Sequence, residues 1–377
     1  MSNQVEGMEH VVLVLFENRS LDNLLGRLYE PGEGKSFDGV VGKDLSNPIP
    51  EWAEHKPEGE QRISYKIATD MDSPSPDSGE EYPHTNTQLF NVQDDANRYQ
   101  MADKITAPWN VPPSGTTPNM EGFVTDYVSF FTATMGRQPT VDEYSQIMTG
   151  FTPEQVPVLN GLARGFATFD HWFSEVPSQT FPNRAFWVSA TSSGFVKNAP
   201  SSNFIQHNEA ETIFNRLDAC GKTWKIYVCE PSSISFTGLI SAPRLKDKFA
   251  THIVPFSEFE SDAASGTLPD FSMVEPALVS GHNDYHPAAG MAMLQGIDLP
   301  VDPPSSVLGG EGFLARVYGA VRGANSPTGS NWRNTMLFVG FDEPGGTYDH
   351  VPPPKVPAPD HDAPEGQCGF RFDLSGY

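Results

Sequence analysis

Two short apolar runs near opposite ends of the chain constrain its fold most. Residues 11–16 are wholly apolar and are followed at once by Glu17, and the apolar run at residues 336–341 is followed by Asp342 and Glu343. Continuous apolar runs of this length are typical of buried parallel strands. Open α/β folds place their sites at the carboxyl ends of such strands. We therefore expect both strands to deliver carboxylates to one edge of a sheet.

The residues that follow the two runs are candidate metal ligands. Glu17 is followed by Asn18, and a carboxylate and an amide carbonyl are hard oxygen ligands for a divalent cation. In the late segment a glycine pair permits a sharp turn before His350. The alternative for the first segment is that Glu17 and Asp22 only cap a helix at residues 21–28. Two strands that both end in candidate ligands favour the metal site.

Thr180 is a candidate nucleophile. Pro182 is typical of the first turn of a helix, which places Thr180 at the N-terminal end of that helix. Free backbone N–H groups and the helix dipole favour an anion there. A hydroxyl is a weak nucleophile at neutral pH, so it needs a metal or a base to activate it. The alternative is that Thr180 is an ordinary helix cap.

The rest of the chain alternates between strands and helices. Strands are predicted at residues 166–169, 224–228 and 271–274, and helices at residues 156–164, 209–220 and 312–322. Residues 44–118, rich in Pro, Asp, Glu, Ser and Gly, predict a long excursion over the carboxyl edge without a core of its own. This order predicts a doubly wound α/β sheet with helices on both faces, in a single domain of residues 1–377.

Three segments, in this order, resemble the phosphoesterase family that contains bacterial and plant non-specific phospholipases C and a group of acid phosphatases. The segments are Glu17-Asn18-Arg19-Ser20-Leu21-Asp22, Thr180-Phe181-Pro182-Asn183-Arg184, and residues 341–354. Weaker similarities fill the gaps, so the resemblance runs from Met8 to the last residue. It implies an alkaline-phosphatase-like α/β architecture and the hydrolysis of phosphoric esters.

The resemblance also implies a role for each matched residue. Glu17, Asn18, Asp342 and Glu343 correspond to the ligands of one divalent metal ion, whose identity the sequence does not give. Thr180 corresponds to a nucleophile that is transiently phosphorylated. The expected activity is therefore cleavage of a phosphodiester of the phospholipase C type, through a phosphothreonine intermediate and with the help of the metal.

The resemblance assigns further residues to the substrate. Asn183 is expected to bind a phosphate oxygen, and His286 and His350 to surround the phosphate, one of them donating a proton to the leaving alcohol. His84 is matched more loosely to another active-site histidine. Pro344 stands where the family usually has histidine, which removes a potential ligand or proton donor.

Two alternatives to a phospholipase C remain open. The first is an acid phosphatase that acts on phosphomonoesters, because the sequence does not show how the pocket treats a second ester group. The second is a catalytically inactive binding relative, which the change at Pro344 favours. Intact Thr180 and Asn183, together with both acidic segments, argue against this second alternative.

Composition limits the partners. The formal charge of −24 opposes binding to nucleic acid or to an anionic membrane surface. A phospholipid head group or a small phosphoester fits this charge better. No apolar stretch approaches the length of a transmembrane helix. The oligomeric state is not predicted.

The two ends of the chain carry expectations of their own. Residues 11–16 lack the basic region and cleavage site of a signal peptide, so we expect a cytoplasmic protein, or an exported one if a signal was removed. In the related family, a segment similar to residues 370–377 leads into a further core strand and helix. We therefore expect a truncated C-terminus, with an apolar edge exposed near Phe370 and Phe372.

Overall fold

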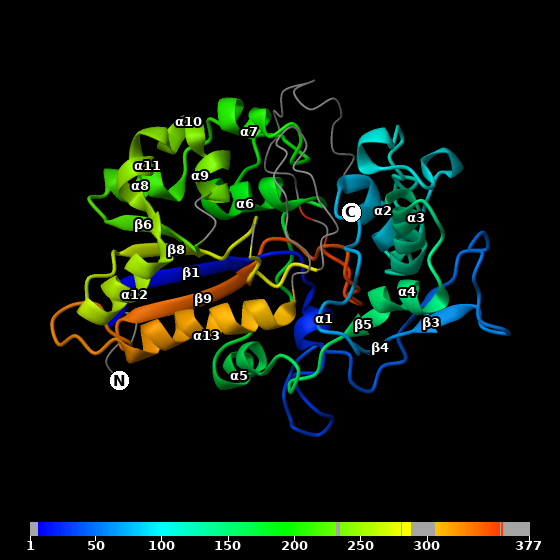
Figure 1. The fold of residues 1–377 in the computed structure, drawn as a ribbon, viewed down its shortest axis with the longest axis horizontal. Helices are drawn as coiled ribbons and strands as arrows, with labels where there is room; N and C mark the ends of the chain where they lie inside the picture. Colours follow the sequence, from blue (N-terminus) through cyan, green and yellow to red (C-terminus); the bar gives the residue numbers. More distant parts are fainter. Residues whose placement is uncertain (1–6, 231–233, 280, 288–305, 355, 357–377) are drawn as a thin grey trace.

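The centre of the fold is a five-stranded parallel sheet with the order β7-β6-β8-β1-β9 (Figure 1). The structure is a computed structural model that describes residues 7–230, 234–279, 281–287, 306–354 and Val356. The strands are β1 (His10–Phe16), β6 (Trp224–Val228), β7 (Ile253–Pro255), β8 (Phe271–Glu275) and β9 (Thr335–Phe341). The strands predicted at residues 11–16, 224–228, 271–274 and 336–341 are thus confirmed.

Helices cover both faces of the sheet, as predicted (Figure 1). Successive side chains of a strand point to opposite faces. Val12, Val14 and Phe16 of β1 pack with residues of α5, α12 and α13, whereas Leu15 packs with residues of α6 and α8. These helices are α5 (Pro157–Gly165), α6 (Thr180–Ser189), α8 (Ile213–Ala219), α12 (Phe256–Ser265) and α13 (Val307–Gly323). A parallel sheet with two covered faces is the doubly wound α/β arrangement.

A second apolar cluster lies beside the sheet, where Figure 1 shows α2, α3 and α4. Residues 44–118 supply five buried side chains to it, and residues 120–148 supply most of the others. The five are Ile49, Ala53, Ile63, Leu89 and Phe90. The long excursion therefore does have a core, but it shares this core with the helices that follow it.

The remaining elements are short. The helices are α1 (Leu21–Leu25), α2 (Tyr82–Phe90), α3 (Phe123–Met135), α4 (Val141–Ser145), α7 (Ser202–His207), α9 (Phe236–Ile240), α10 (Ala242–Leu245) and α11 (Phe249–His252). The strands outside the main sheet are β2 (Ser46–Pro48), β3 (Arg62–Ser64), β4 (Lys66–Ile67) and β5 (Thr149–Gly150). Four short 3₁₀ helices complete the described part: Asp95–Asn97, Ala102–Lys104, Gln146–Met148 and Lys246–Lys248.

The strand predicted at residues 166–169 is wrong, because this segment is irregular. Phe166 and Phe169 are 66% and 59% exposed, and Phe169 stacks on Phe338 of β9 with ring centroids 6.5 Å apart. A short apolar run does not by itself distinguish a buried strand from a group of surface aromatic residues.

Three predicted helices differ from the observed ones in length. The first helix ends at Leu25 rather than at residue 28, because the chain turns at Gly26, whose carbonyl accepts a hydrogen bond from Val40 N at 2.7 Å. The helix predicted at residues 209–220 begins only at Ile213, where Thr212 and Asn215 form a capping box. The helix predicted at residues 312–322 is the C-terminal part of the longer α13.

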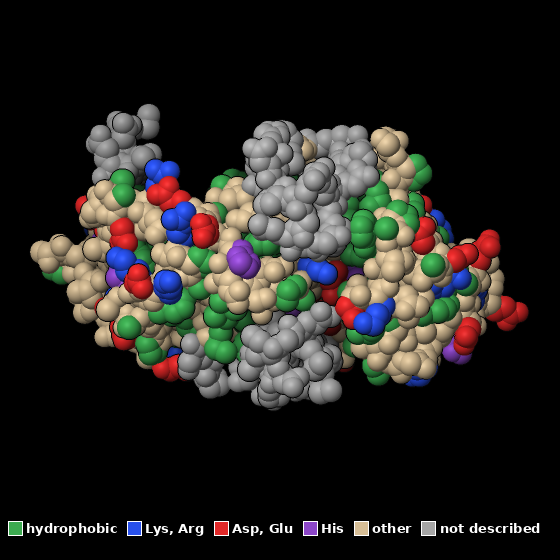
Figure 2. Space-filling model, turned by 90° about the horizontal axis from the view of Figure 1, so that it is seen from above, with side chains coloured by type: hydrophobic (Ala, Val, Ile, Leu, Met, Phe, Trp, Pro, Cys, Tyr) green, Lys and Arg blue, Asp and Glu red, His purple; other side chains and the backbone are tan. Residues whose placement is uncertain are grey.

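The surface and the chain end complete the description. On the face in Figure 2, Lys and Arg side chains of the described residues are interspersed with Asp and Glu. Among the described residues, no helix combines the length and the apolar character needed to cross a bilayer. Phe370 and Phe372, near which an exposed apolar edge is predicted, lie outside the described residues.

Candidate active site

The two acidic segments meet at the carboxyl edge of the sheet. Strands β1 and β9 pair in parallel with Phe16 opposite Phe341, so Glu17 and Asp342 leave the sheet side by side. Asp342 N donates a hydrogen bond to the carbonyl of Phe16 at 3.1 Å. Both carboxylates are buried although 325 positions separate them in the sequence.

The loop after β9 presses closely against Asn18. Asn18 has φ 58°, a left-handed conformation that asparagine tolerates better than most residues. Its backbone N donates to Asp342 Oδ1 at 3.4 Å. Gly345, with φ 57°, lies so near that a Cβ there would be 2.4 Å from the Cβ of Asn18. Only glycine fits this position, which explains part of the glycine pair.

Pro344 begins the tight turn that contains this glycine pair. Its carbonyl accepts hydrogen bonds from Thr347 N at 3.1 Å and from Thr347 Oγ1 at 2.8 Å. The proline therefore supplies a turn where the resemblance would place an imidazole.

Arg184 joins helix α6 to the acidic edge. Its side chain is completely buried, and its Nε donates to Asp342 Oδ2 at 3.0 Å. Its Nη2 lies 3.4 Å from Glu17 Oε1, and its Nη1 lies 3.6 Å from Glu275 Oε1. Thr180 is the first residue of α6, so it lies one turn before Arg184 on the same side of the helix. The role of Arg184 was not predicted from the sequence.

Several buried oxygens at this edge are suited to a cation. Glu17 Oε1, Asn18 Oδ1 and Glu343 Oε1 are buried and lack a hydrogen-bond partner among the described residues. Carboxylate oxygens and amide carbonyl oxygens are the donors that hard divalent ions prefer. The residues predicted as metal ligands therefore fit such an ion by their chemistry.

The electrostatics of the same residues point in the same direction. Burial raises the pKa of Glu17 well above its ordinary value, although Arg184 opposes the shift. Burial also raises the pKa of Asp342 to about 6, again against Arg184. The pKa of Glu343 is raised by burial and by Glu80, Asp342 and Glu17. A bound cation would offset this repulsion between buried carboxylates.

Two groups of acidic and histidine side chains in the described part of the chain have ligand atoms within 4.8 Å of one another. One contains Asp77, Glu80 and His286, and the other contains Asp22, Asp349 and His350. Neither group is the predicted ligand set. In that set, the guanidinium of Arg184 lies between Glu17 and Asp342. In the described part of the chain, the structure thus has two such groups besides the predicted ligand set.

The first of these groups adjoins the predicted ligands. Glu80 accepts a hydrogen bond from Asn18 Nδ2, and its other oxygen accepts one from Gln179 Nε2 at 3.3 Å. His286 Nε2 lies 3.7 Å from Asp77 Oδ2. Burial raises the pKa of Glu80 to about 7, with Asp77 adding to the shift. Glu80 lies in a stretch rich in Pro, Asp and Glu, where nothing in the sequence distinguishes it from solvated acids.

The start of α6 differs from a simple anion site. Phe181 N donates to Asn198 Oδ1 at 2.7 Å, and Pro182 has no N–H, so two of the first backbone positions offer nothing to a phosphate. Asn183 is fully buried, and its side chain holds the preceding loop through Val176, Ser178 and Gln179. Asn183 therefore positions the loop that leads to Thr180, and its contact with phosphate stays a prediction from the sequence.

His84 lies in a buried ion pair with Asp126. Its Nδ1 is 2.8 Å from Asp126 Oδ1, and Gln88 Nε2 donates to the other oxygen of Asp126 at 2.8 Å. Burial alone would lower the pKa of His84, but the hydrogen bond to Asp126 and the charges of Asp126, Glu81 and Glu80 together outweigh burial and raise this pKa to about 9. These contacts tie α2 to α3.

We expect this ion pair to make stability depend on pH. Because the pKa of His84 is higher in the folded than in the unfolded chain, the pair contributes fully below about pH 6.5 and its contribution is lost as the pH rises through about 9. The free energy of unfolding of the wild type should thus fall relative to that of His84→Gln by about 2–3 kcal/mol over this range. Urea unfolding of both proteins at pH 6, 7, 8 and 9 measures the difference. A constant difference across these pH values would contradict a charged His84.

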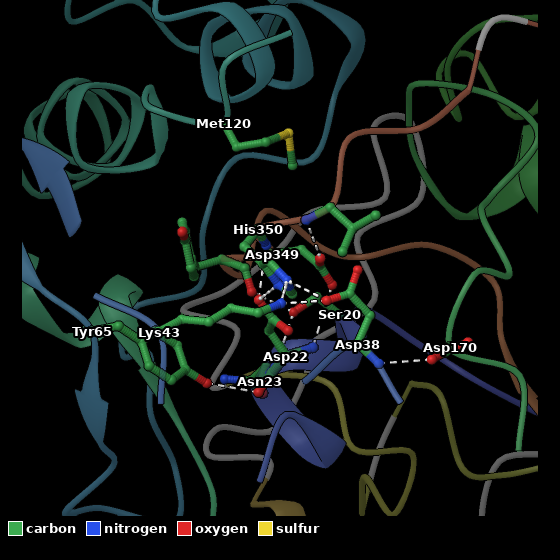
Figure 3. A network of polar contacts seen from close by, with 12 residues as sticks. Ser20, Asp22, Asn23, Asp38, Lys43, Tyr65, Met120, Asp170, Asp349 and His350 are labelled. Atoms are coloured by element: carbon green, nitrogen blue, oxygen red, sulfur yellow. Dashed lines mark hydrogen bonds and ion pairs between the residues drawn. The ribbon is translucent and has the colours of Figure 1, made fainter. Parts of the chain in front are cut away.

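His350 lies in the second acidic group, shown in Figure 3. Its Nδ1 is 2.7 Å from Asp22 Oδ2, its Nε2 is 3.1 Å from Asp38 Oδ1, and Lys43 contacts both Asp38 and the imidazole. Burial lowers the pKa of His350, but Asp22 and Asp38 raise this pKa by a larger amount, so the net shift is upward. His350 therefore fastens the loop after β9 to α1 and to residues 38–43.

The comparisons with known proteins agree with the sequence motifs. The model of the Phosphoesterase family matches residues 8–375. Non-specific phospholipases C6 and C1 of Arabidopsis thaliana are 31% and 30% identical to this chain, over 97% and 98% of its length. Phospholipase C B of Mycobacterium tuberculosis is 24% identical over 59% of the chain and 43% of its own length. The chain spans 59% of the length of the two plant relatives.

Proposed function

The chain belongs to the Phosphoesterase family, and from this premise we propose that it hydrolyses phosphoric esters by phospholipase C type cleavage. The observation that carries the proposal is the meeting of Glu17 and Asp342 at one sheet edge, with Arg184 linking them to the helix that begins at Thr180. An architecture of the alkaline-phosphatase type is part of the proposal, and the parallel sheet with helices on both faces supports it.

Thr180 is the proposed nucleophile. Its oxygen forms a bond to phosphorus while the bond from phosphorus to the leaving alcohol breaks and that alcohol takes up a proton. Water then attacks the phosphothreonine, which releases the phosphorylated product and restores the Thr180 hydroxyl. A ring of contacts supports the position of Thr180 near the acidic edge. Gln179 precedes it and donates to Glu80, Glu80 accepts from Asn18, and Asn18 N donates to Asp342, which is paired with Arg184 in the next turn of α6.

One divalent cation is proposed at Glu17, Asn18, Asp342 and Glu343. When bound, such an ion supplies a Lewis acid that lowers the pKa of a hydroxyl and offsets phosphate charge. Asn18 Oδ1 and Glu343 Oε1, which have no hydrogen-bond partner among the described residues, support this assignment. Arg184 would hold Glu17 and Asp342 in place and keep part of the negative charge balanced.

His286 is the proposed proton donor to the leaving alcohol. Its Nδ1 lies 2.8 Å from the carbonyl of Pro287, a geometry that makes Nδ1 the donor and leaves Nε2 facing Asp77. His350 was the other candidate from the sequence. Its contacts with Asp22 and Asp38 favour a structural role for it instead.

The substrate is proposed to be a phospholipid head group or another small phosphoester, in line with the names of the relatives. Acid phosphatase activity on monoesters and an inactive binding protein are the competing possibilities from the sequence. The proposed location in the cytoplasm likewise stays a prediction from the sequence.

One panel of assays tests the proposed function. We expect the protein to release p-nitrophenol from p-nitrophenyl phosphorylcholine faster than from p-nitrophenyl phosphate, and to lose this activity when a chelator removes divalent ions. Adding back Mn²⁺ should restore it. The order of rates distinguishes a diesterase from a monoesterase, since only the first substrate carries a second ester group.

Each other result points to a different conclusion. Faster release from p-nitrophenyl phosphate would favour the acid phosphatase. Full activity in chelator would exclude a required cation that exchanges with solvent. No release from either substrate, with or without added Mn²⁺, would leave the inactive binding relative as the better description.

A further inference from the structure

Glu80 contacts both sides of the proposed active site. One of its carboxylate oxygens accepts a hydrogen bond from Asn18, a predicted cation ligand, and the other accepts one from Gln179, the neighbour of Thr180. Glu80 reaches this place from the loop that precedes α2, in a part of the chain with no recognisable motif.

The contact with Glu80 fixes which way the amide of Asn18 faces. The amide nitrogen of Asn18 faces Glu80 and donates to Glu80 Oε2, an orientation that suits an ionised carboxylate, which has no proton to donate. The oxygen Oδ1 then faces away from Glu80, and it is buried with no hydrogen-bond partner among the described residues. The left-handed backbone of Asn18 and the close contact with Gly345 leave this side chain little freedom.

We propose that Glu80 is a positioning residue that holds the Asn18 oxygen toward the cation and, through Gln179, keeps the start of α6 at a fixed distance from it. The inference rests on the proposed function, because it assumes a cation at Glu17 and Asn18. Partners of metal ligands act in this way in other proteins, where their loss weakens metal affinity by about 10–100-fold.

The test is the affinity for Mn²⁺, measured by isothermal titration calorimetry on the full chain. In Glu80→Gln the new amide has a single oxygen, so it cannot accept from both Asn18 and Gln179. Its NH₂ group also invites Asn18 to rotate and present its oxygen to residue 80. We expect Mn²⁺ to bind about 10–100-fold more weakly than to the wild type, at the same melting temperature.

Two further variants make the test specific. Glu81→Gln changes the neighbouring carboxylate, which lies 3.8 Å from His84, and should leave the affinity for Mn²⁺ unchanged. The double variant Asn18→Asp with Glu80→Gln should recover most of the lost affinity. In it, one oxygen of the new carboxylate accepts from Gln at position 80 and the other remains available to the cation. Asn18→Asp alone is the reference for this recovery, because the new carboxylate adds negative charge to the site whatever the role of Glu80.

Three results would overturn the inference. The first is equal affinity for Mn²⁺ in the wild type and in Glu80→Gln, and the second is no recovery of affinity in the double variant. The third is that the wild type binds two Mn²⁺ ions and Glu80→Gln binds one, which would make Glu80 itself a ligand. Failure of the proposed function looks different, since Mn²⁺ would bind and respond to Glu80 while no phosphoester is cleaved. Hydrolysis without any bound Mn²⁺ would overturn the inference and leave the proposed reaction standing.

Discussion

Thr180→Ala is expected to lower turnover of p-nitrophenyl phosphorylcholine by about 10³-fold or more while the protein stays folded. The loss is large because removing a nucleophile abolishes the covalent route and leaves only the help of the surrounding site. The folded state should be little affected. Thr180 is the first residue of α6, whereas the cap position belongs to Gln179, so the cost is below the ~1 kcal/mol typical of a lost cap.

Thr180→Ser is the matched control for this experiment, since it keeps the hydroxyl and removes only a methyl group. It should retain far more activity than the alanine variant, and both should melt near the wild-type temperature. Mass spectrometry of rapidly quenched reactions with p-nitrophenyl phosphorylcholine provides a second measurement, in which the wild type gains one phosphorylcholine group and Thr180→Ala gains none. Activity of Thr180→Ala within a few-fold of the wild type would remove Thr180 from the mechanism and favour direct attack by water.

The strands that carry the site could be predicted because their signal is local. The runs at residues 11–16 and 336–341 are continuous and apolar, as expected for strands covered on both faces, and the acids that follow them mark where the chain leaves the sheet. Parallel strands end at the same edge, so the meeting of Glu17 and Asp342 followed from topology alone.

The contacts that tie these segments together could not be predicted in this way. Arg184 pairs with Asp342 across 158 positions, and Glu80 pairs with Asn18 across 62, so neither contact leaves a periodic pattern in the sequence. Glu275 could have been predicted as a third acid of the site, because it directly follows the strand predicted at residues 271–274. An acid at that position belongs to the same edge as Glu17.

His350 makes contacts that its place in the sequence does not indicate. It follows Asp342 by eight positions, but its side chain lies against Asp22 and Asp38. The loops after β1 and β9 run side by side, so that Glu17 lies next to Asp342, and Asp22 next to His350 further along. The tight turn at Gly345 and Gly346 precedes the contact between Asp22 and His350. The direction of the chain after this turn depends on the backbone conformation, which residue types alone do not specify.

Arg184→Met is expected to be the most destabilising single change in the site. Methionine fills a similar volume but leaves Glu17, Asp342 and Glu275 buried without the positively charged guanidinium that they share. Breaking a buried ion pair by removing one partner costs about 3–5 kcal/mol. Urea unfolding at pH 7 should show a loss of this size. Arg316→Met is the control, because Arg316 pairs with Glu260 at the surface, where such pairs contribute about 0–1 kcal/mol.

The same variant separates a structural network from a site built around a cation. If the carboxylates left by Arg184→Met can bind a divalent ion, saturating Mn²⁺ should recover part of the lost free energy of unfolding, since an ion that binds only the folded state stabilises it. Lower pH should also recover part of the loss, because burial already raises the pKa of Asp342 to about 6 and protonation removes the uncompensated charge. Mn²⁺ should give no such recovery in Arg316→Met. An Arg184→Met protein as stable as the wild type at pH 7 would show that these carboxylates are already protonated there, and would remove the charge balance on which the proposed cation depends.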